Sequence, residues 1–367
     1  MSGPSLSPTR AKQGAGRRVV VASDKFKGSL TSAEVAAAVG TGLRQVHPDM
    51  TVVSVPVADG GDGTLAAAVA AGFHLVPVTA SGPTGKPVKT SYARRDDVAV
   101  VELADVSGLV RLPGGVPAPT TATSRGTGEL IAAATDAGCT RVILGIGGSA
   151  STDGGAGIVN ALAGTDALDL RALRDRMDGI EVVVACDVDN PLTGATGAAA
   201  VYGPQKGANP VQVKELDAAL GRWADLVARE TGQDLRDAPG AGAAGGVGFA
   251  ALALLGAELR PGIELVLELV GFHEQLQGAD LVITGEGALD EQTLHGKAVA
   301  GVAAAAAGIP VVAVCGSNNL DPERLRSAGV VAAYALTDLE PDVRRCIAEP
   351  VPLLQRLGER IAADHLR

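Results

Sequence analysis

The chain alternates short, wholly apolar runs with longer segments of helical period. Val-rich runs occupy residues 18–24, 141–148 and 309–316, and segments with apolar residues at helical spacing, such as 29–46 and 127–138, stand between such runs. A strand without polar positions has to be covered on both faces. The alternation therefore predicts an α/β fold with a Rossmann-like or flavodoxin-like parallel sheet between two layers of helices.

Two regions break this rhythm. Residues 74–112 are rich in strand residues with Pro/Gly turns and period-2 alternation, and residues 180–240 pass from an apolar run through a Gly-rich stretch into a polar helix. A chain of 367 residues suggests about two domains. We expect a discontinuous Rossmann-like domain and a second, smaller α/β domain, with the active site in the cleft between them. The expected boundaries are 18–73, 117–170 and 241–367 for the first domain, 74–116 and 171–240 for the second, and 1–17 for a disordered tail.

The net charge and the cysteines indicate which partners and which compartment suit the protein. The formal net charge of −10 argues against nucleic acid or an anionic membrane as the main partner. The four cysteines lie far apart, without a CxxC pair or zinc spacing, so buried free thiols in a reducing compartment are expected. The polar N-terminus has no apolar core of a secretory signal. We expect a cytoplasmic protein, monomeric or homodimeric, with a small-molecule substrate.

Glycine-rich segments imitate nucleotide-binding motifs without matching them fully. No GxxxxGK[ST] segment is present, which disfavours a P-loop enzyme. Residues 240–245 match GxGxxG but follow no predicted strand. Residues 145–150 match GxGxxA after a strand, yet no acidic residue follows at the ribose spacing. A nicotinamide cofactor is therefore disfavoured.

A more informative pattern is the polar, glycine-rich turn that follows at least five predicted strands. Ligands of open parallel sheets bind outside the carboxyl ends of the strands, where helix N-termini favour anions. The alternatives are tight turns for the glycines, solvated charge for the lysines and helix caps for the aspartates. The turns are SDKFKGSL (23–30), ADGGDGT (58–64), GIGGSASTDGGAG (145–157), ITGEGALDEQT (283–293) and VCGSNN (314–319).

The run VVVACDVDNPL (182–192) ends in two carboxylates. In an extended chain Asp187 and Asp189 point to the same side, so the pair suits a Mg²⁺ ion or a general base, with turn capping as the alternative. Lys206 follows in a Gly/Pro-framed turn (202–208). Acidic and basic groups that converge beside glycine-rich turns indicate phosphoryl transfer to a small anion.

From about Val19 to its C-terminus the chain resembles the bacterial two-domain glycerate kinases. No single motif decides the resemblance, but the set occurs in the family's order. The motifs are SDKFKGSLTS (23–32), PVADGGDGT (56–64), SGPTGKPV (81–88), TSRGTGELI (123–131), ILGIGGSASTDGGAG (143–157), VACDVDNPL (184–192), YGPQKGA (202–208), PGAGAAGGVGFA (239–250) and DLVITGEGALDEQTLHGK (280–297).

The resemblance implies ATP-dependent phosphorylation of D-glycerate with Mg²⁺, mostly to 2-phosphoglycerate, although some relatives are described as 3-kinases. One passage departs from the family. Residues 165–179 are shorter than usual, which indicates a missing loop and acidic hairpin and makes the domain boundary there hard to place. No catalytic motif lies in this gap.

On this resemblance we assign roles to individual residues. Asp189 is expected to accept the hydroxyl proton and Asp187 to bind the metal or orient the base, although the two roles could be exchanged. Lys206 would offset charge on the transferring phosphoryl group. Residues expected to bind glycerate are Asp24, Lys25, Lys27, Asp59 and Arg125. Residues expected to bind nucleotide are Gly147, Gly148, Ser149, Gly285, Glu286, Gly287 and Asp290, with Glu286 as a second metal ligand.

Two other functions share the same sheet. A nicotinamide-dependent oxidoreductase of hydroxy acids would use the GxGxxA turn. A non-catalytic sensor of small ligands is the third hypothesis, although the sequence offers no DNA-binding helix or basic patch for a regulator.

Overall fold

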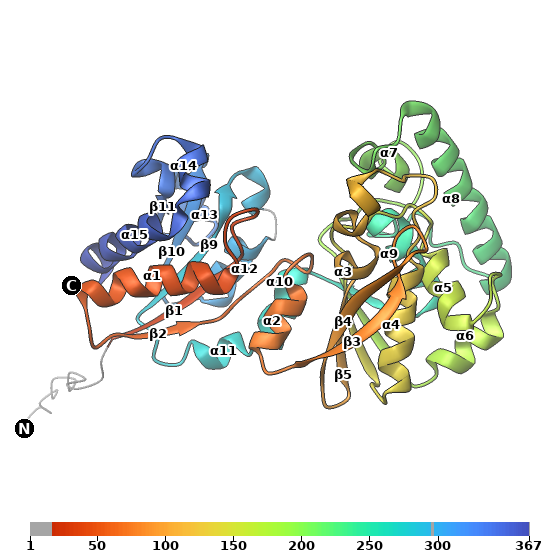
Figure 1. The fold of residues 1–367 in the computed structure, drawn as a ribbon, viewed down its shortest axis with the longest axis horizontal. Helices are drawn as coiled ribbons and strands as arrows, with labels where there is room; N and C mark the ends of the chain where they lie inside the picture. Colours follow the sequence, from red (N-terminus) through yellow and green to blue (C-terminus); the bar gives the residue numbers. More distant parts are fainter. Residues whose placement is uncertain (1–16, 295–296, 367) are drawn as a thin grey trace, which may run out of the picture.

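Five parallel strands form the first of two sheets in the computed structural model, which describes residues 17–294 and 297–366 (Figure 1). The strand order is β11-β10-β9-β1-β2. In chain order this is the 2-1-3-4-5 sequence of flavodoxin-like sheets, which confirms the expected fold class. The strands are β1 (Arg18–Ser23), β2 (Thr51–Ser54), β9 (Leu281–Leu289), β10 (Val311–Asn318) and β11 (Ala332–Ala335).

Both faces of this sheet are buried, as its apolar strands require. Val19 and Val21 of β1 belong to a cluster with helices α1 and α15, whereas Val20 and Ala22 belong to a cluster with α10 and α12 on the opposite face. The helices around this sheet are α1 (Ser32–Val46), α10 (Gly262–Leu269), α11 (Phe272–Gln275), α12 (Ala298–Ala305), α13 (Pro322–Ser327), α14 (Val343–Ala348) and α15 (Pro350–His365).

The second sheet is mixed and has six strands in chain order, β3 to β8. Its first three strands are antiparallel, and from β5 onward the strands are parallel. These strands are β3 (His74–Ser81), β4 (Pro87–Arg95), β5 (Val98–Glu102), β6 (Arg141–Gly145), β7 (Glu181–Ala185) and β8 (Glu258–Arg260). The helices of this lobe are α2 (Thr64–Ala70), α3 (Ala104–Ser107), α4 (Arg125–Asp136), α5 (Ala156–Ala163), α6 (Leu170–Met177), α7 (Ala198–Tyr202), α8 (Pro210–Thr231) and α9 (Ala243–Leu254).

Helix α10 joins the two sheets. Ile263 and Val266 pack in the core of the first sheet. Leu265 packs against Val183 of β7, and Leu269 packs in a cluster with Val100 of β5 and Ile143 of β6. In Figure 1 the helix lies between the two lobes, beside α2. A helix that is apolar nearly all round is expected to be buried, and here it is buried between two sheets.

The sheet pairing differs from the expected domain division. Residues 117–170 and 241–260 were expected in the Rossmann-like domain, yet β6 pairs with β5 and β7, and β8 pairs with β7. All strands between residues 74 and 260 therefore belong to the second sheet. An apolar run between two helices fits either parallel sheet, and its partners are chosen by contacts distant in sequence.

Other sequence-based expectations concern the short passage before β7, the cysteines and the N-terminal tail. The short passage before β7 holds α6, whose N-cap Asp169 accepts a hydrogen bond from the backbone of Ala172. All four cysteines are free thiols, three of them buried, as expected. No helix in the described residues is long and apolar enough to cross a membrane. The proposed tail, apart from Arg17, lies outside the described residues.

Candidate active site

A cavity opens at the carboxyl edge of the first sheet. It has a volume of about 610 Å³ and is lined by Asp24 and Lys25 after β1 and by Glu286 and Gly287 on β9. Strands β1 and β9 are neighbours in the sheet, and the order of the chain reverses between them. Ligands of open α/β sheets bind at such a switch point, so the topology itself marks this cavity as a binding site.

A smaller cavity of about 210 Å³ opens at the carboxyl edge of the second sheet. Ser149 follows β6, Asp187 follows β7, and Lys206 enters from the turn after α7. The three side chains come from three separate segments of the chain. The parallel strands β6 and β7 bring Ser149 and Asp187 together because their carboxyl ends meet at one edge.

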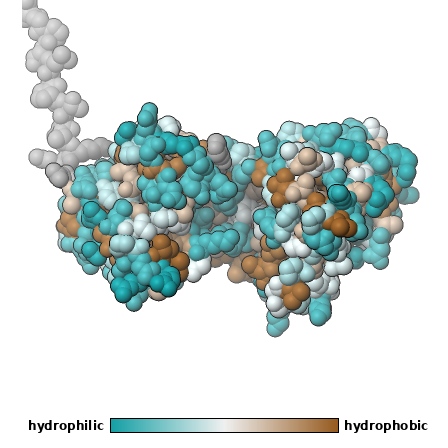
Figure 2. Space-filling model, turned by 90° about the horizontal axis from the view of Figure 1, so that it is seen from above, coloured by the Kyte–Doolittle hydropathy of each residue, from teal (hydrophilic) through white to brown (hydrophobic). Residues whose placement is uncertain are grey.

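The two cavities adjoin. Asp59, Gly61, Gly147 and Gly148 line both of them. Seen from above, the surface forms two lobes with a waist between them (Figure 2). A ligand in one cavity therefore lies beside a ligand in the other, which is the arrangement that a transfer between two substrates needs.

Glycines let the backbones approach at this junction. A Cβ atom added to Gly147 would lie 2.6 Å from the Cα of Gly61, and one added to Gly60 would lie 2.5 Å from the Cβ of Ala185. Gly60 also has φ of +84°, which disfavours any other residue. Gly60 and Gly147 thus occupy positions that favour glycine where the two sheets meet.

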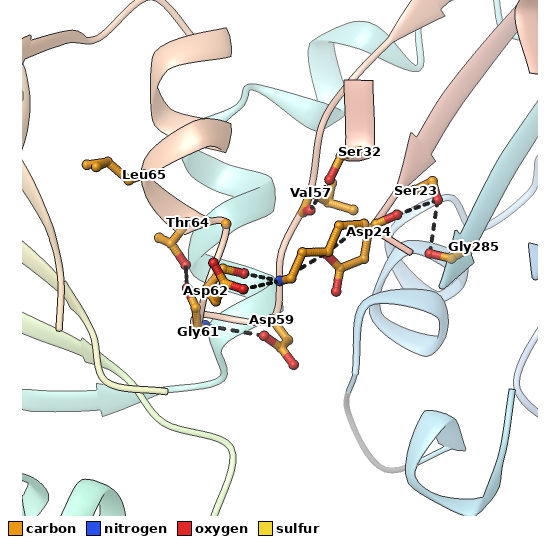
Figure 3. Close-up of polar contacts among 12 residues, drawn as sticks. Ser23, Asp24, Ser32, Val57, Asp59, Gly61, Asp62, Thr64, Leu65 and Gly285 are labelled. Carbon is orange, nitrogen blue, oxygen red and sulfur yellow. Dashed lines mark hydrogen bonds and ion pairs between the residues drawn. The ribbon is translucent and has the colours of Figure 1, made fainter. Parts of the chain in front are cut away.

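Two aspartates lie beside the lysine of the first turn. The Nζ of Lys25 lies 3.4 Å from Asp62 and 3.9 Å from Asp24, and it donates a hydrogen bond to the carbonyl oxygen of Asp62. Asp59 lies close by and accepts a hydrogen bond from Gly61 (3.2 Å; Figure 3). Lys25 therefore connects the strand end of the first sheet to the turn at the junction.

Carboxyl groups crowd the junction without a pre-formed metal cluster. Burial raises the pKa of Asp24 and of Asp187 to about 6 each and raises the pKa of Glu286 as well. The charge of nearby Asp59 acts in the same direction on all three. No group of three or more potential metal ligands occurs among residues 17–294 and 297–366. A cation bound here would need further oxygen ligands from a substrate.

Lys206 is the main cationic group of the smaller cavity. Its side chain is only 3% exposed, and its Nζ donates hydrogen bonds to the Oγ of Ser149 (2.8 Å) and to the carbonyl oxygen of Ser151 (2.6 Å). Burial lowers the pKa of the ammonium to about 8. Within the described residues it has no ion-pair partner, so an anion in the cavity would gain a strong charge-assisted contact.

The two carboxylates of the VVVACDVDNPL run do not line the same cavity. Strand β7 ends at Ala185, so both carboxylates follow the strand and neither belongs to it. Asp187 lines the smaller cavity and accepts a hydrogen bond from the backbone of Gly262 (2.8 Å). Asp187 and Asp189 are both exposed, but Asp189 lines neither cavity.

Some expected site residues lie away from the cavities. Arg125 forms ion pairs with Glu129 (3.2 Å) and Asp166 (3.1 Å) and lines neither cavity. Asp290 closes a local turn by accepting a hydrogen bond from Gln292. Gly285 is buried in the sheet, where its carbonyl accepts from Asp24. The remaining expected residues, Lys27 and the turns with Gly148, Ser149 and Gly287 among them, line one or both cavities.

The GxGxxG segment at 240–245 has a packing role. A Cβ atom on Gly245 would lie 2.0 Å from the carbonyl oxygen of Ser151, and one on Gly242 would lie 2.2 Å from that of Pro191. These glycines are therefore required for close backbone contact with the turns after β6 and β7. The segment gives no support to the nicotinamide hypothesis.

Sequence reasoning missed Glu102, the last residue of β5. It is 6% exposed, and its Oε2 accepts hydrogen bonds from the backbone of Gly63 (3.2 Å) and of Leu65 (2.9 Å). Glu102 thereby attaches the junction turn and the start of α2 to the second sheet. A single acid at the end of an otherwise apolar strand was the available signal.

Comparisons with known proteins agree with this geometry. The model of the glycerate kinase family matches residues 19–366. The glycerate kinase of Bacillus subtilis is 40% identical, covering 95% of this chain and 97% of its own. The glycerate 2-kinase of Escherichia coli is 41% identical, covering 87% and 90%. A crystal structure assigned as a glycerate kinase 2 from Salmonella typhimurium LT2 has a TM-score of 0.79 and 40% identity, covering 95% and 98%.

The chain belongs to the glycerate kinase family. The resemblance found in the sequence is thereby confirmed, and the protein is an enzyme, a kinase. A kinase acts on two substrates, and the two adjoining cavities provide room for both.

Kinases commonly use a nucleotide with Mg²⁺, and the junction suits that combination. Mg²⁺ prefers oxygen ligands and is usually held by one or two carboxylates together with substrate phosphates. Asp24 and Glu286 are carboxylates at the larger cavity, and burial together with the charge of Asp59 raises the pKa of each, an effect that a bound cation would offset. The chemistry of these donors therefore fits Mg²⁺ held jointly by the protein and a bound nucleotide.

Proposed function

We propose that this enzyme transfers the γ-phosphoryl group of ATP to D-glycerate and releases ADP and 2-phosphoglycerate. The 2-position is supported by the name of the Escherichia coli relative, a glycerate 2-kinase. The observation that carries the proposal is the shared wall of the two cavities, with carboxylates on both sides and the buried ammonium of Lys206 in one of them. Donor and acceptor would meet at this wall.

The sizes of the cavities suggest which substrate each one takes. The smaller cavity, with Lys206 and Ser149, suits a small anion such as glycerate. The larger cavity suits ATP, with its phosphates near Lys25 and Lys27. We therefore propose that these two lysines contact the nucleotide, whereas the sequence-based hypothesis gave them to glycerate.

The transfer needs one proton acceptor. The oxygen of the glycerate 2-hydroxyl attacks the γ-phosphorus, the bond from that phosphorus to the bridging oxygen of the β-phosphate breaks, and ADP leaves. We propose that Asp187 takes the hydroxyl proton, because it lines the smaller cavity and Asp189 does not. Lys206 offsets the charge of glycerate and of the arriving phosphoryl group. Mg²⁺ bound with ATP, with Glu286 as a protein ligand, would neutralise phosphate charge.

Phosphorus NMR of the reaction mixture tests this proposal. Purified enzyme with ATP, Mg²⁺ and D-glycerate is expected to give the resonances of ADP and 2-phosphoglycerate, and a mixture without glycerate should give neither. A signal of 3-phosphoglycerate would establish a 3-kinase instead. ATP left intact in the presence of glycerate would refute phosphoryl transfer from ATP.

A further inference from the structure

Two apolar side chains stand exposed at one wall of the larger cavity. Val343 and Ile347 of α14 are 53% and 52% exposed, and both line the cavity. They are four residues apart in a helix and so lie on the same face. Single exposed apolar residues are common, but a pair on one face beside a binding cavity is typical of a contact surface.

The layer beneath this pair is already packed. Phe26, Leu336 and Cys346 also line the cavity, yet they are nearly fully buried in the core of the first sheet. The Oγ of Ser29 donates a hydrogen bond to the carbonyl oxygen of Ile347 (3.1 Å), which attaches α14 to the lysine turn. Val343 and Ile347 thus form an apolar surface that residues 17–294 and 297–366 leave exposed.

The same cavity is polar elsewhere. Lys25, Lys27 and Lys297 line it, together with the carboxylates of Asp24 and Glu286. Glycerate carries a carboxylate and two hydroxyls on three carbons, so it has no apolar surface that could pack against an apolar wall. A nucleotide has a flat base with apolar faces at one end and phosphates, with their cation, at the other. The distribution of polarity in the cavity matches a nucleotide lying along it.

We propose that the Val343–Ile347 face of α14 is the surface on which the base of the nucleotide packs. The inference rests on the proposed function only in taking a purine nucleotide as the donor. It orients the donor, because a base on α14 directs its phosphates past the lysines toward the junction at Gly61 and Gly147.

The test compares two probes on one double variant. Val343→Gln/Ile347→Gln makes the face polar without adding charge and keeps helix-compatible side chains. Isothermal titration with ADP and Mg²⁺ is expected to show binding about tenfold weaker than in the wild type, a loss of about 1.4 kcal/mol. Titration with pyrophosphate and Mg²⁺, which lack a base, should be unchanged.

The control is Val351→Gln, which changes a 38% exposed valine of α15 that does not line the cavity. It should bind ADP as the wild type does. The inference is overturned if the double variant binds ADP normally, if pyrophosphate binding weakens equally, or if the wild type binds no ADP. The proposed function is judged separately, since ADP binding can be measured whether or not the NMR experiment finds a phosphorylated product.

Discussion

At the scale of single residues, Lys206 is the residue whose expected effects on stability and on activity differ most. A lysine that is 3% exposed, with two neutral oxygen acceptors and a pKa lowered to about 8, costs folding free energy when it is charged. A residue kept under such a cost is expected to serve the reaction.

Lys206→Met therefore should separate activity from stability. Methionine has a similar length and no charge to bury, so the midpoint of thermal unfolding is expected to stay equal or rise. The kcat/KM for glycerate is expected to fall by at least about 10²-fold, the scale of losing one electrostatic contact to a transition state. Calorimetry and a coupled assay for ADP measure both quantities. A variant that unfolds early yet keeps its kcat/KM would show that Lys206 is structural.

The pair Asp187 and Asp189 allows a matched comparison, because the two changes are identical and the positions are two residues apart. Asp187→Asn is expected to lower kcat by at least about 10²-fold, the scale of general-base loss. Asp189→Asn should leave kcat within a few fold, since this side chain lines neither cavity. Steady-state kinetics with saturating ATP decides between them. The reverse result would restore the sequence-based hypothesis, in which Asp189 accepts the proton.

At the scale of secondary-structure elements, the connection between β5 and α2 positions the junction turn. Glu102 ends β5 and accepts two backbone hydrogen bonds near the start of α2. Burial raises its pKa from an ordinary 4.5 to about 7. Since the folded state binds this proton more tightly than the unfolded state, Glu102's contribution to stability is greatest below pH 4.5 and falls as the pH rises to about 7.

Glu102→Gln should remove this pH dependence. The amide oxygen can accept both backbone bonds, which the carboxylate receives on one oxygen. The free energy of unfolding of the variant is expected to rise relative to that of the wild type between about pH 4.5 and 7. Above pH 7 the difference approaches roughly 3 kcal/mol. Urea titrations at a series of pH values measure the difference.

Glu34→Gln provides a contrast of opposite sign. Hydrogen bonds from the backbone and side chain of Thr31 lower the pKa of Glu34, so this variant should lose relative stability as the pH rises. A difference between Glu102→Gln and the wild type that does not vary with pH would contradict the raised pKa.

At the scale of the whole molecule, α10 makes the two lobes depend on each other. Leu265 is 2% exposed and packs against Val183 and Ala185 of the second sheet, while neighbouring residues pack against the first. The junction turn is also close, since a Cβ atom on Gly262 would lie 2.1 Å from the carbonyl oxygen of Asp59.

Leu265→Ala is expected to cost about 2–5 kcal/mol of unfolding free energy, the usual range for removing a buried leucine. Because α10 is shared, both lobes should lose stability together. Denaturant titration followed by circular dichroism, with Trp223 fluorescence as a probe in the second lobe, would show one shifted transition. Val211→Ala, at a valine that is 65% exposed, is the control and should change stability little. A loss confined to the first lobe would contradict the coupling.

The sequence by itself determined the elements and most residues of the candidate site. Apolar runs, helical periods and caps such as Thr31 act through neighbours along the chain, and the carboxyl ends of parallel strands gather polar turns in any open α/β sheet. The tertiary structure alone decided that β6 joins the second sheet, that Asp187 and not Asp189 lines a cavity, and that Arg125 pairs with Asp166. Strand partners and side-chain directions depend on contacts between segments far apart in the chain, and a local sequence pattern does not specify those contacts.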